Sequence, residues 1–154
     1  MKTLILGIGN ILMGDEGMGI HVIRYLQKNY PLPDVDIVDG GTGGFHLLDY
    51  FQRYQRVMLV DATIDGKAPG TITVLKPKFS SDYPPTLTAH DIGLKDLLDA
   101  LYLLKKQPEI ILFTISIPSL SELSLKLSEE LLPAVKAAAE SAVTYLKENP
   151  KSGS

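Results

Sequence analysis

Four side chains in this sequence are of types that bind metal ions or transfer protons, and their positions along the chain are similar. Glu16 follows an apolar run, Asp39 and Asp61 each end one, and His90 closes a long loop before a helical pattern begins. Ligands of open α/β sheets bind outside the carboxyl ends of the strands. We therefore expect these four side chains to converge at one edge of a sheet.

The chemistry that such a cluster favours is binding of a divalent cation. Two carboxylates within about 4–6 Å repel each other unless a cation lies between them. Glu16, Asp61 and His90 would supply two oxygens and an imidazole nitrogen, a set that suits Ni²⁺, Zn²⁺ or Mn²⁺ and leaves coordination positions open. Taken singly, each residue also has a structural explanation: Glu16 at the positive end of a helix, Asp61 capping a turn, and His90 beside a capping Asp91. Their common placement at strand ends favours the metal site.

The elements that would position these residues alternate between strands and helices. Apolar runs predict strands over residues 4–9, 35–38, 56–62, 71–75 and 110–117, and helical spacing predicts helices over residues 18–26, 45–51, 94–104 and 131–146. The alternating strand 71–75 is expected near a sheet edge. This order predicts an α/β fold, a three-layer α/β/α sandwich with a mostly parallel five-stranded sheet. We expect a single domain over residues 1–148 and a flexible tail over residues 149–154.

Composition excludes several classes of function. The 154 residues include 15 Lys plus Arg, 18 Asp plus Glu and no Cys, for a formal charge of −3. This balance argues against nucleic acid or an anionic membrane surface as a partner. Without Cys there is no disulfide, thiolate nucleophile or Cys-ligated zinc. No apolar run is long enough for a membrane span or a signal peptide, so we expect a soluble, cytoplasmic protein.

Common catalytic and nucleotide-binding motifs are absent or incomplete. Residues 7–12 lack the third glycine of a dinucleotide fingerprint, and Gly66-Lys67 is followed by Ala68, so there is no P-loop. HExxH and GxSxG do not occur. A nucleotide-binding domain is therefore disfavoured. His21, within a predicted helix, is expected to be structural, and the role of His46 stays open.

Four segments together resemble the motifs of a known family. They read GIGNILMGDEGMG over residues 7–19, DGGTGG over 39–44, VDA over 60–62 with APGT over 68–71, and TAHDIGL over 88–94. In this order and with these intervals they resemble the hydrogenase maturation endopeptidases, and the match spans almost the whole chain.

The resemblance implies a nickel-dependent endopeptidase that removes the C-terminal extension of a [NiFe] hydrogenase large-subunit precursor after nickel insertion. It implies that Glu16, Asp61 and His90 contact nickel, which belongs to the substrate and which other divalent ions could replace. Asp39, with the glycines of residues 40–44, would line the same cleft as a further catalytic residue. We expect a monomer when the protein is free.

Two questions stay open at this point. The metal could polarise the scissile carbonyl or lower the pKa of a water, with Asp39 or Glu16 as general base. A non-catalytic, nickel-checking chaperone for the immature large subunit would need the same three ligands. Residues 117–122 read IPSLSE, where the family often has Pro-Glu-Ser-Leu, and we interpret this departure as a difference in specificity.

Overall fold

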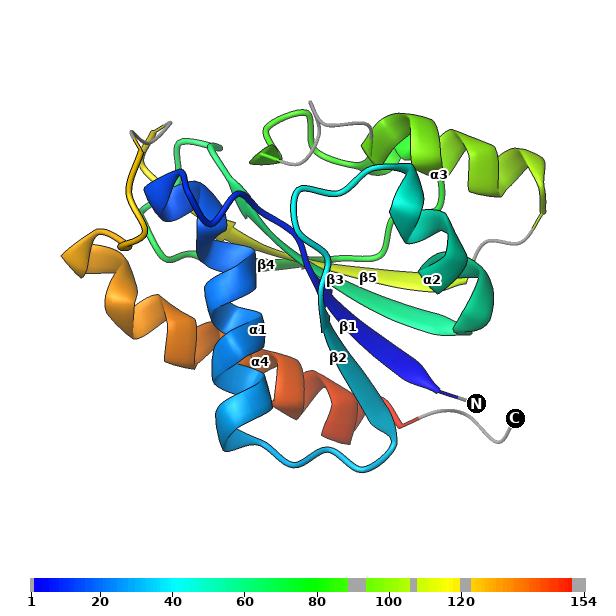
Figure 1. Cartoon of the computed structure of the whole chain (residues 1–154), viewed down its shortest axis with the longest axis horizontal. Helices are drawn as coiled ribbons and strands as arrows, with labels where there is room; N and C mark the ends of the chain where they lie inside the picture. The colour runs from blue at the N-terminus through cyan, green and yellow to red at the C-terminus, as the bar shows by residue number, and fades with distance from the viewer. Residues whose placement is uncertain (1, 89–93, 106–107, 120–122, 151–154) are drawn as a thin grey trace.

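The computed structural model describes residues 2–88, 94–105, 108–119 and 123–150, which form one five-stranded sheet with helices on both faces (Figure 1). The strands are β1 (Thr3–Gly7), β2 (Val35–Asp39), β3 (Arg56–Thr63), β4 (Ile72–Leu75) and β5 (Glu109–Ser116). Their order in the sheet is β2-β1-β3-β5-β4. All neighbouring pairs are parallel except β4 with β5, so the mostly parallel sheet and the edge position of residues 71–75 are confirmed.

Two pairs of helices make the outer layers. Helices α1 (Met18–Asn29) and α4 (Leu132–Glu148) cover one face of the sheet, and α2 (Leu48–Arg53) and α3 (Leu94–Leu103) cover the other. Short 3₁₀ helices precede or separate them: η1 (Gly14–Gly17), η2 (Phe45–Leu47), η3 (Ser80–Asp82) and η5 (Glu129–Leu131). The predicted three-layer α/β/α sandwich is therefore confirmed.

Strand β3 is the centre of the molecule, and all eight of its residues are buried. Successive side chains of a strand point to opposite faces. Met58 and Val60 accordingly pack in the cluster under α1 and α4, whereas Val57 and Leu59 pack in the cluster under α2 and α3. A strand covered on both faces needs an unbroken apolar run, which is the pattern that the sequence shows. The same alternation assigns Asp61 to the α2 and α3 side.

Gly19 allows α1 to begin directly against the ends of β1 and β3. A Cβ atom at this position would lie 2.4 Å from the carbonyl oxygens of both Ile8 and Val60. Such an approach is open only to glycine, since real Cβ contacts are longer. The close contact brings η1, the 3₁₀ turn directly before α1, to the carboxyl edge of the sheet.

The loop between β2 and α2 is held by backbone hydrogen bonds to the segment that follows β1. Gly40 N donates to the carbonyl oxygen of Gly7 at 2.8 Å, and Gly9 N donates to that of Gly41 at 2.8 Å. Gly43 is buried and has φ of 91°, a region that β-branched residues rarely adopt. The loop therefore requires glycine at this position.

The end of the chain that the structure describes packs onto the domain. Nη1 of the buried Arg56 donates to the carbonyl oxygen of Asn149 at 2.6 Å. Residues 151–154 lie outside the described residues, so the flexible tail stays a prediction. Among the helices described, none combines the length and apolar character needed to cross a membrane.

We expect Gly43→Val to lower the free energy of unfolding by about 1–3 kcal/mol, because the new side chain is strained at positive φ. Thr42→Val is the matched control, since Thr42 is exposed in the same loop. Urea denaturation followed by circular dichroism measures both variants. Equal stability of the two would show that the loop tolerates a β-branched residue at position 43.

Candidate functional site

Glu16 lies at the carboxyl edge of the sheet, in η1, which packs against β3. Ile8 N donates to the carbonyl oxygen of Val60 at 2.9 Å, so the contact between β1 and β3 continues past the end of β1. Asn10 N then donates to the carbonyl oxygen of Glu16 at 3.2 Å. These bonds hold the half-buried Glu16 beside the end of β3, as its position in the sequence predicts.

Asp61 is a buried carboxylate near the end of β3, with 1% of its surface exposed. Burying a charge is costly unless hydrogen bonds stabilise it. Two donors are directed to one oxygen, Oδ1: the backbone N of Ala62 at 2.8 Å and Oγ1 of Thr88 at 2.8 Å. These two hydrogen bonds hold the carboxylate in one orientation.

The segment that carries Thr88 is paired with the end of β3. Thr63 and Leu87 form an antiparallel bridge, and Ile64 N donates to the carbonyl oxygen of Thr86 at 3.0 Å. The hydroxyls of Thr63 and Thr86 are 2.7 Å apart and share a hydrogen bond. This short ladder brings the chain leading to His90 beside Asp61.

His90 itself lies outside the described residues, and its role as a ligand stays a prediction. Within the part of the chain that the structure describes, no group of three or more His, Cys, Asp or Glu side chains is arranged to hold a metal ion. The structure therefore places Glu16 and Asp61, two of the three predicted ligands, on elements that pack together at one edge of the sheet.

Asp39 is placed differently from the other predicted site residues. Gly7 of β1 pairs with both Asp39 and Val60, so β1 separates β2 from β3. Two strand spacings are about 9.5 Å. By strand alternation Asp39 shares the side of Ile37, under α1 and α4, whereas Asp61 is on the opposite side. The exposed Asp39 carboxylate accepts a hydrogen bond from Gly41 N at 2.8 Å, and its place in a common cleft stays a prediction.

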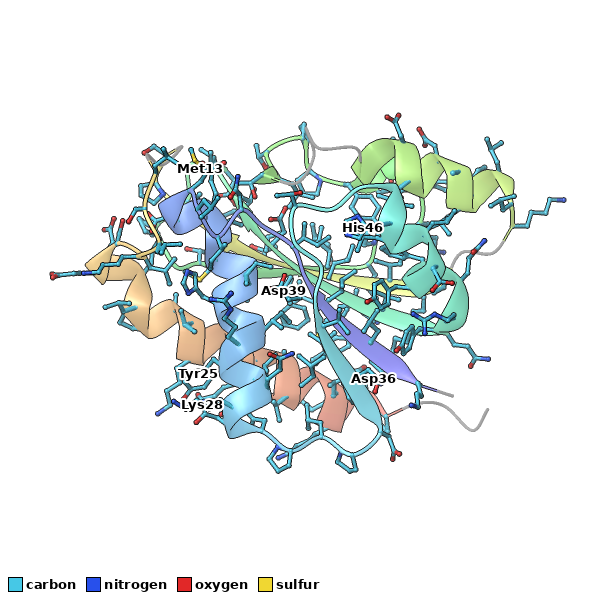
Figure 2. All side chains as sticks on the ribbon, viewed as in Figure 1. Met13, Tyr25, Lys28, Asp36, Asp39 and His46 are labelled. Carbon is cyan, nitrogen blue, oxygen red and sulfur yellow. The ribbon has the colours of Figure 1, made fainter. Side chains whose placement is uncertain are left out.

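The two other histidines lie on different elements, His46 in η2 and His21 in α1. Nε2 of the exposed His46 is 3.3 Å from the carbonyl oxygen of Gly40 and closes the glycine loop (Figure 2). His21 is half-buried in α1. Burial lowers the pKa of His21 below its usual range, Arg24 lowers it further, and Asp15 opposes the shift. His21 is therefore neutral near pH 7, in keeping with the structural role expected for it.

Sequence reasoning missed two residues that organise the site. Asp15, next to Glu16, is buried, and its two carboxylate oxygens accept hydrogen bonds from Ser128 N at 2.7 Å and Ser128 Oγ at 2.6 Å. No local pattern points to a partner 113 positions away. Thr88 lies within the segment that resembles the family's histidine motif, but its bond to Asp61 depends on the pairing of residues 86–88 with β3. Only the fold shows that pairing.

Comparison with known proteins points to one family. A family model described as hydrogenase maturation protease matches residues 20–145. The hydrogenase 2 maturation protease of Escherichia coli (strain K12) is 32% identical over 152 residues, which cover 97% of this chain and 93% of that protein.

Solved structures agree with the sequence comparison. The hydrogenase maturating endopeptidase HybD from E. coli superimposes with a TM-score of 0.86 and 31% identity, over 97% of this chain and 94% of that one. The [NiFe] hydrogenase maturation protease HybD from Thermococcus kodakarensis superimposes with a TM-score of 0.77 and 28% identity, over 94% of this chain and 99% of that one.

These matches confirm the family that the four sequence motifs predict, and they cover the strands and helices that carry Glu16 and Asp61 to one edge. The chain belongs to the hydrogenase maturation protease family and is an endopeptidase, a hydrolase of peptide bonds.

Proposed function

We propose that this protein removes a C-terminal extension from the large-subunit precursor of a [NiFe] hydrogenase after nickel has entered that subunit. The observation that carries the proposal is the pairing of residues 86–88 with the end of β3, which places Thr88 on Asp61. His90 follows Thr88 by two residues, and two residues of chain span at most about 7 Å. This chain length is compatible with the predicted role of His90 as the third ligand.

The donor set supports recognition of an ion that another protein already holds. Two carboxylates and one imidazole suit a borderline divalent ion such as nickel, and they leave coordination positions for ligands from the substrate. The nickel is thus part of the substrate, and this protein would contact it through Glu16, Asp61 and His90. The two hydrogen bonds to Oδ1 of Asp61 hold this carboxylate in one orientation.

The arrangement also favours one of the two candidate general bases. Glu16 is half-buried at the same edge as Asp61, whereas Asp39 is exposed, two strand spacings from β3, and on the other side of the sheet from Asp61. We therefore assign proton abstraction from the attacking water to Glu16. Nickel bound at this edge would supply a Lewis acid for the scissile carbonyl or for that water.

The alternative function is a binding module that tests the immature subunit for nickel without cutting it. It requires the same ligands, but the endopeptidases among the similar proteins favour the enzyme. The cytoplasmic location and the monomeric state stay predictions.

We expect the purified protein to shorten a nickel-loaded large-subunit precursor and to leave the nickel-free precursor intact, because the ion completes the site. Mass spectrometry of the two precursors after incubation measures this. Cleavage of both forms would show that nickel is not required, and binding without cleavage would support the alternative function.

We expect His90→Ala to abolish processing with the fold intact, because it removes a predicted ligand. We expect Glu16→Gln to weaken binding of Ni²⁺ or Cd²⁺ by at least about 10-fold, because it removes the charge of a predicted ligand. Calorimetric titration measures affinity. Glu148→Gln, on the exposed end of α4, is the control for a lost charge. Unchanged ion affinity of Glu16→Gln would indicate Asp39 as the ligand in its place. Cleavage by His90→Ala at the wild-type rate would refute the predicted ligand set of Glu16, Asp61 and His90.

We expect Thr88→Val to weaken divalent-ion binding by about 10-fold, because Asp61 loses the hydroxyl donor that helps to fix its orientation. Thr88→Ser should retain wild-type affinity, since it keeps the hydroxyl. Thr86→Val is a matched control: it removes a threonine hydroxyl bond in the same segment but not the one to Asp61. Equal losses in Thr88→Val and Thr86→Val would mean that the segment matters only for folding.

A further inference from the structure

Three leucines beside the candidate site are exposed to solvent, although leucine is usually an interior residue. The exposed fractions are 55% for Leu12, 80% for Leu123 and 64% for Leu125. We call these three side chains, on residues 10–14 and 123–126, the leucine ribbon. Contiguous apolar surface of this kind marks interaction sites in soluble proteins.

The two segments of the ribbon are joined through their backbones. Ser124 N donates to the carbonyl oxygen of Leu12 at 2.8 Å, and Gly14 N donates to that of Ser124 at 2.8 Å. Met13 and Ser124 form an isolated parallel bridge, and Figure 2 shows Met13 at the place where the two segments lie side by side. Leucines more than 100 positions apart in the sequence therefore share one surface.

Side-chain hydrogen bonds hold each segment in place. Leu12 N donates to Oδ1 of Asn10 at 3.0 Å, and Lys126 N donates to Oγ of Ser124 at 3.0 Å. The two bonds from Ser128 to the buried Asp15 anchor the end of the second segment. The ribbon is thus ordered before any partner binds, which lowers the entropic cost of binding.

The position of the ribbon identifies its occupant. Gly14, which the ribbon binds through Ser124, is the first residue of η1, and Glu16 lies two residues further on. The ribbon is therefore continuous with the turn that carries Glu16, so a polypeptide that is cut at this edge and extends past η1 would lie against the three leucines. From this continuity we propose that the leucine ribbon is the docking surface for an apolar segment of the protein substrate, next to the bond that is cut. This inference rests on the proposed function and adds where the substrate is held.

Leu123→Lys/Leu125→Lys tests the proposal, since it replaces exposed side chains and leaves the candidate ligands unchanged. We expect KM for the nickel-loaded precursor to rise by about 10-fold or more, because the substitutions remove apolar side chains that anchor the precursor. We expect kcat to stay within about twofold of wild type. Cd²⁺ affinity and the melting temperature should stay at wild-type values, which shows that the fold and the ion site are intact.

The matched control is Leu103→Lys/Leu104→Lys. These leucines are exposed to 78% and 51%, and Figure 1 shows the end of α3 on the opposite side of the molecule from residues 123–128. We expect this variant to keep wild-type KM. Equal KM values for the two double variants would overturn the proposal.

Direct binding of the precursor, measured by calorimetry, separates this proposal from the proposed function. If wild type binds the precursor but cuts neither form, the proposed function fails, and weaker binding by the ribbon variant still supports the docking surface. If wild type does not bind the precursor, both proposals fail. A wild-type dimer that the ribbon variant abolishes, with precursor binding unchanged, would assign the ribbon to self-association and overturn the inference.

Discussion

The buried carboxylate of Asp61 is the constraint on which the site depends. It lies on the central strand, where every residue is buried, and a charge in such a position is unfavourable without compensating hydrogen bonds. The neighbouring backbone N–H supplies one bond, but the second comes from Thr88, 27 residues away. The hydrogen bond from Thr88 to Asp61 depends on the pairing of residues 86–88 with β3. The same pairing brings the chain that leads to His90 to the edge where Glu16 lies.

Close backbone packing at Gly19 positions Glu16, the other carboxylate of the site. With glycine at position 19, α1 begins against the carbonyl oxygens of Ile8 and Val60, and η1 is placed over the strand ends. A larger residue at position 19 would push η1 away from β3 and increase the separation of Glu16 from Asp61. Gly19 thus contributes no functional group, but its small size determines how near Glu16 and Asp61 can lie to each other.

Much of the fold could be predicted because its signals are local. Buried parallel strands read as apolar runs, as β3 does, and amphipathic helices read as periodic patterns, as α4 does. The common edge of Glu16 and Asp61 followed from the rule for parallel strand ends. What the sequence could not show depends on register and long-range pairing. To predict which side of the sheet Asp39 faces, one must know the register of β2 relative to β3, and the sequence does not give this register. The bonds between Asp15 and Ser128 join residues with no sequence relation.

Adjacent acidic residues illustrate why residue type alone does not assign a role. Asp15 and Glu16 carry the same charge on the same 3₁₀ turn, yet Asp15 is buried and bonded to Ser128, whereas Glu16 is half-buried beside the end of β3. Because the bonds of Asp15 anchor the segment that carries Leu125, this carboxylate connects the ion site to the surface of the leucine ribbon. The proposed metal ligands and the proposed docking surface are therefore different side chains, and the one 3₁₀ turn η1 connects them. On the proposed function, substitutions at the leucines would change the docking surface without changing the carboxylates that we propose as ligands.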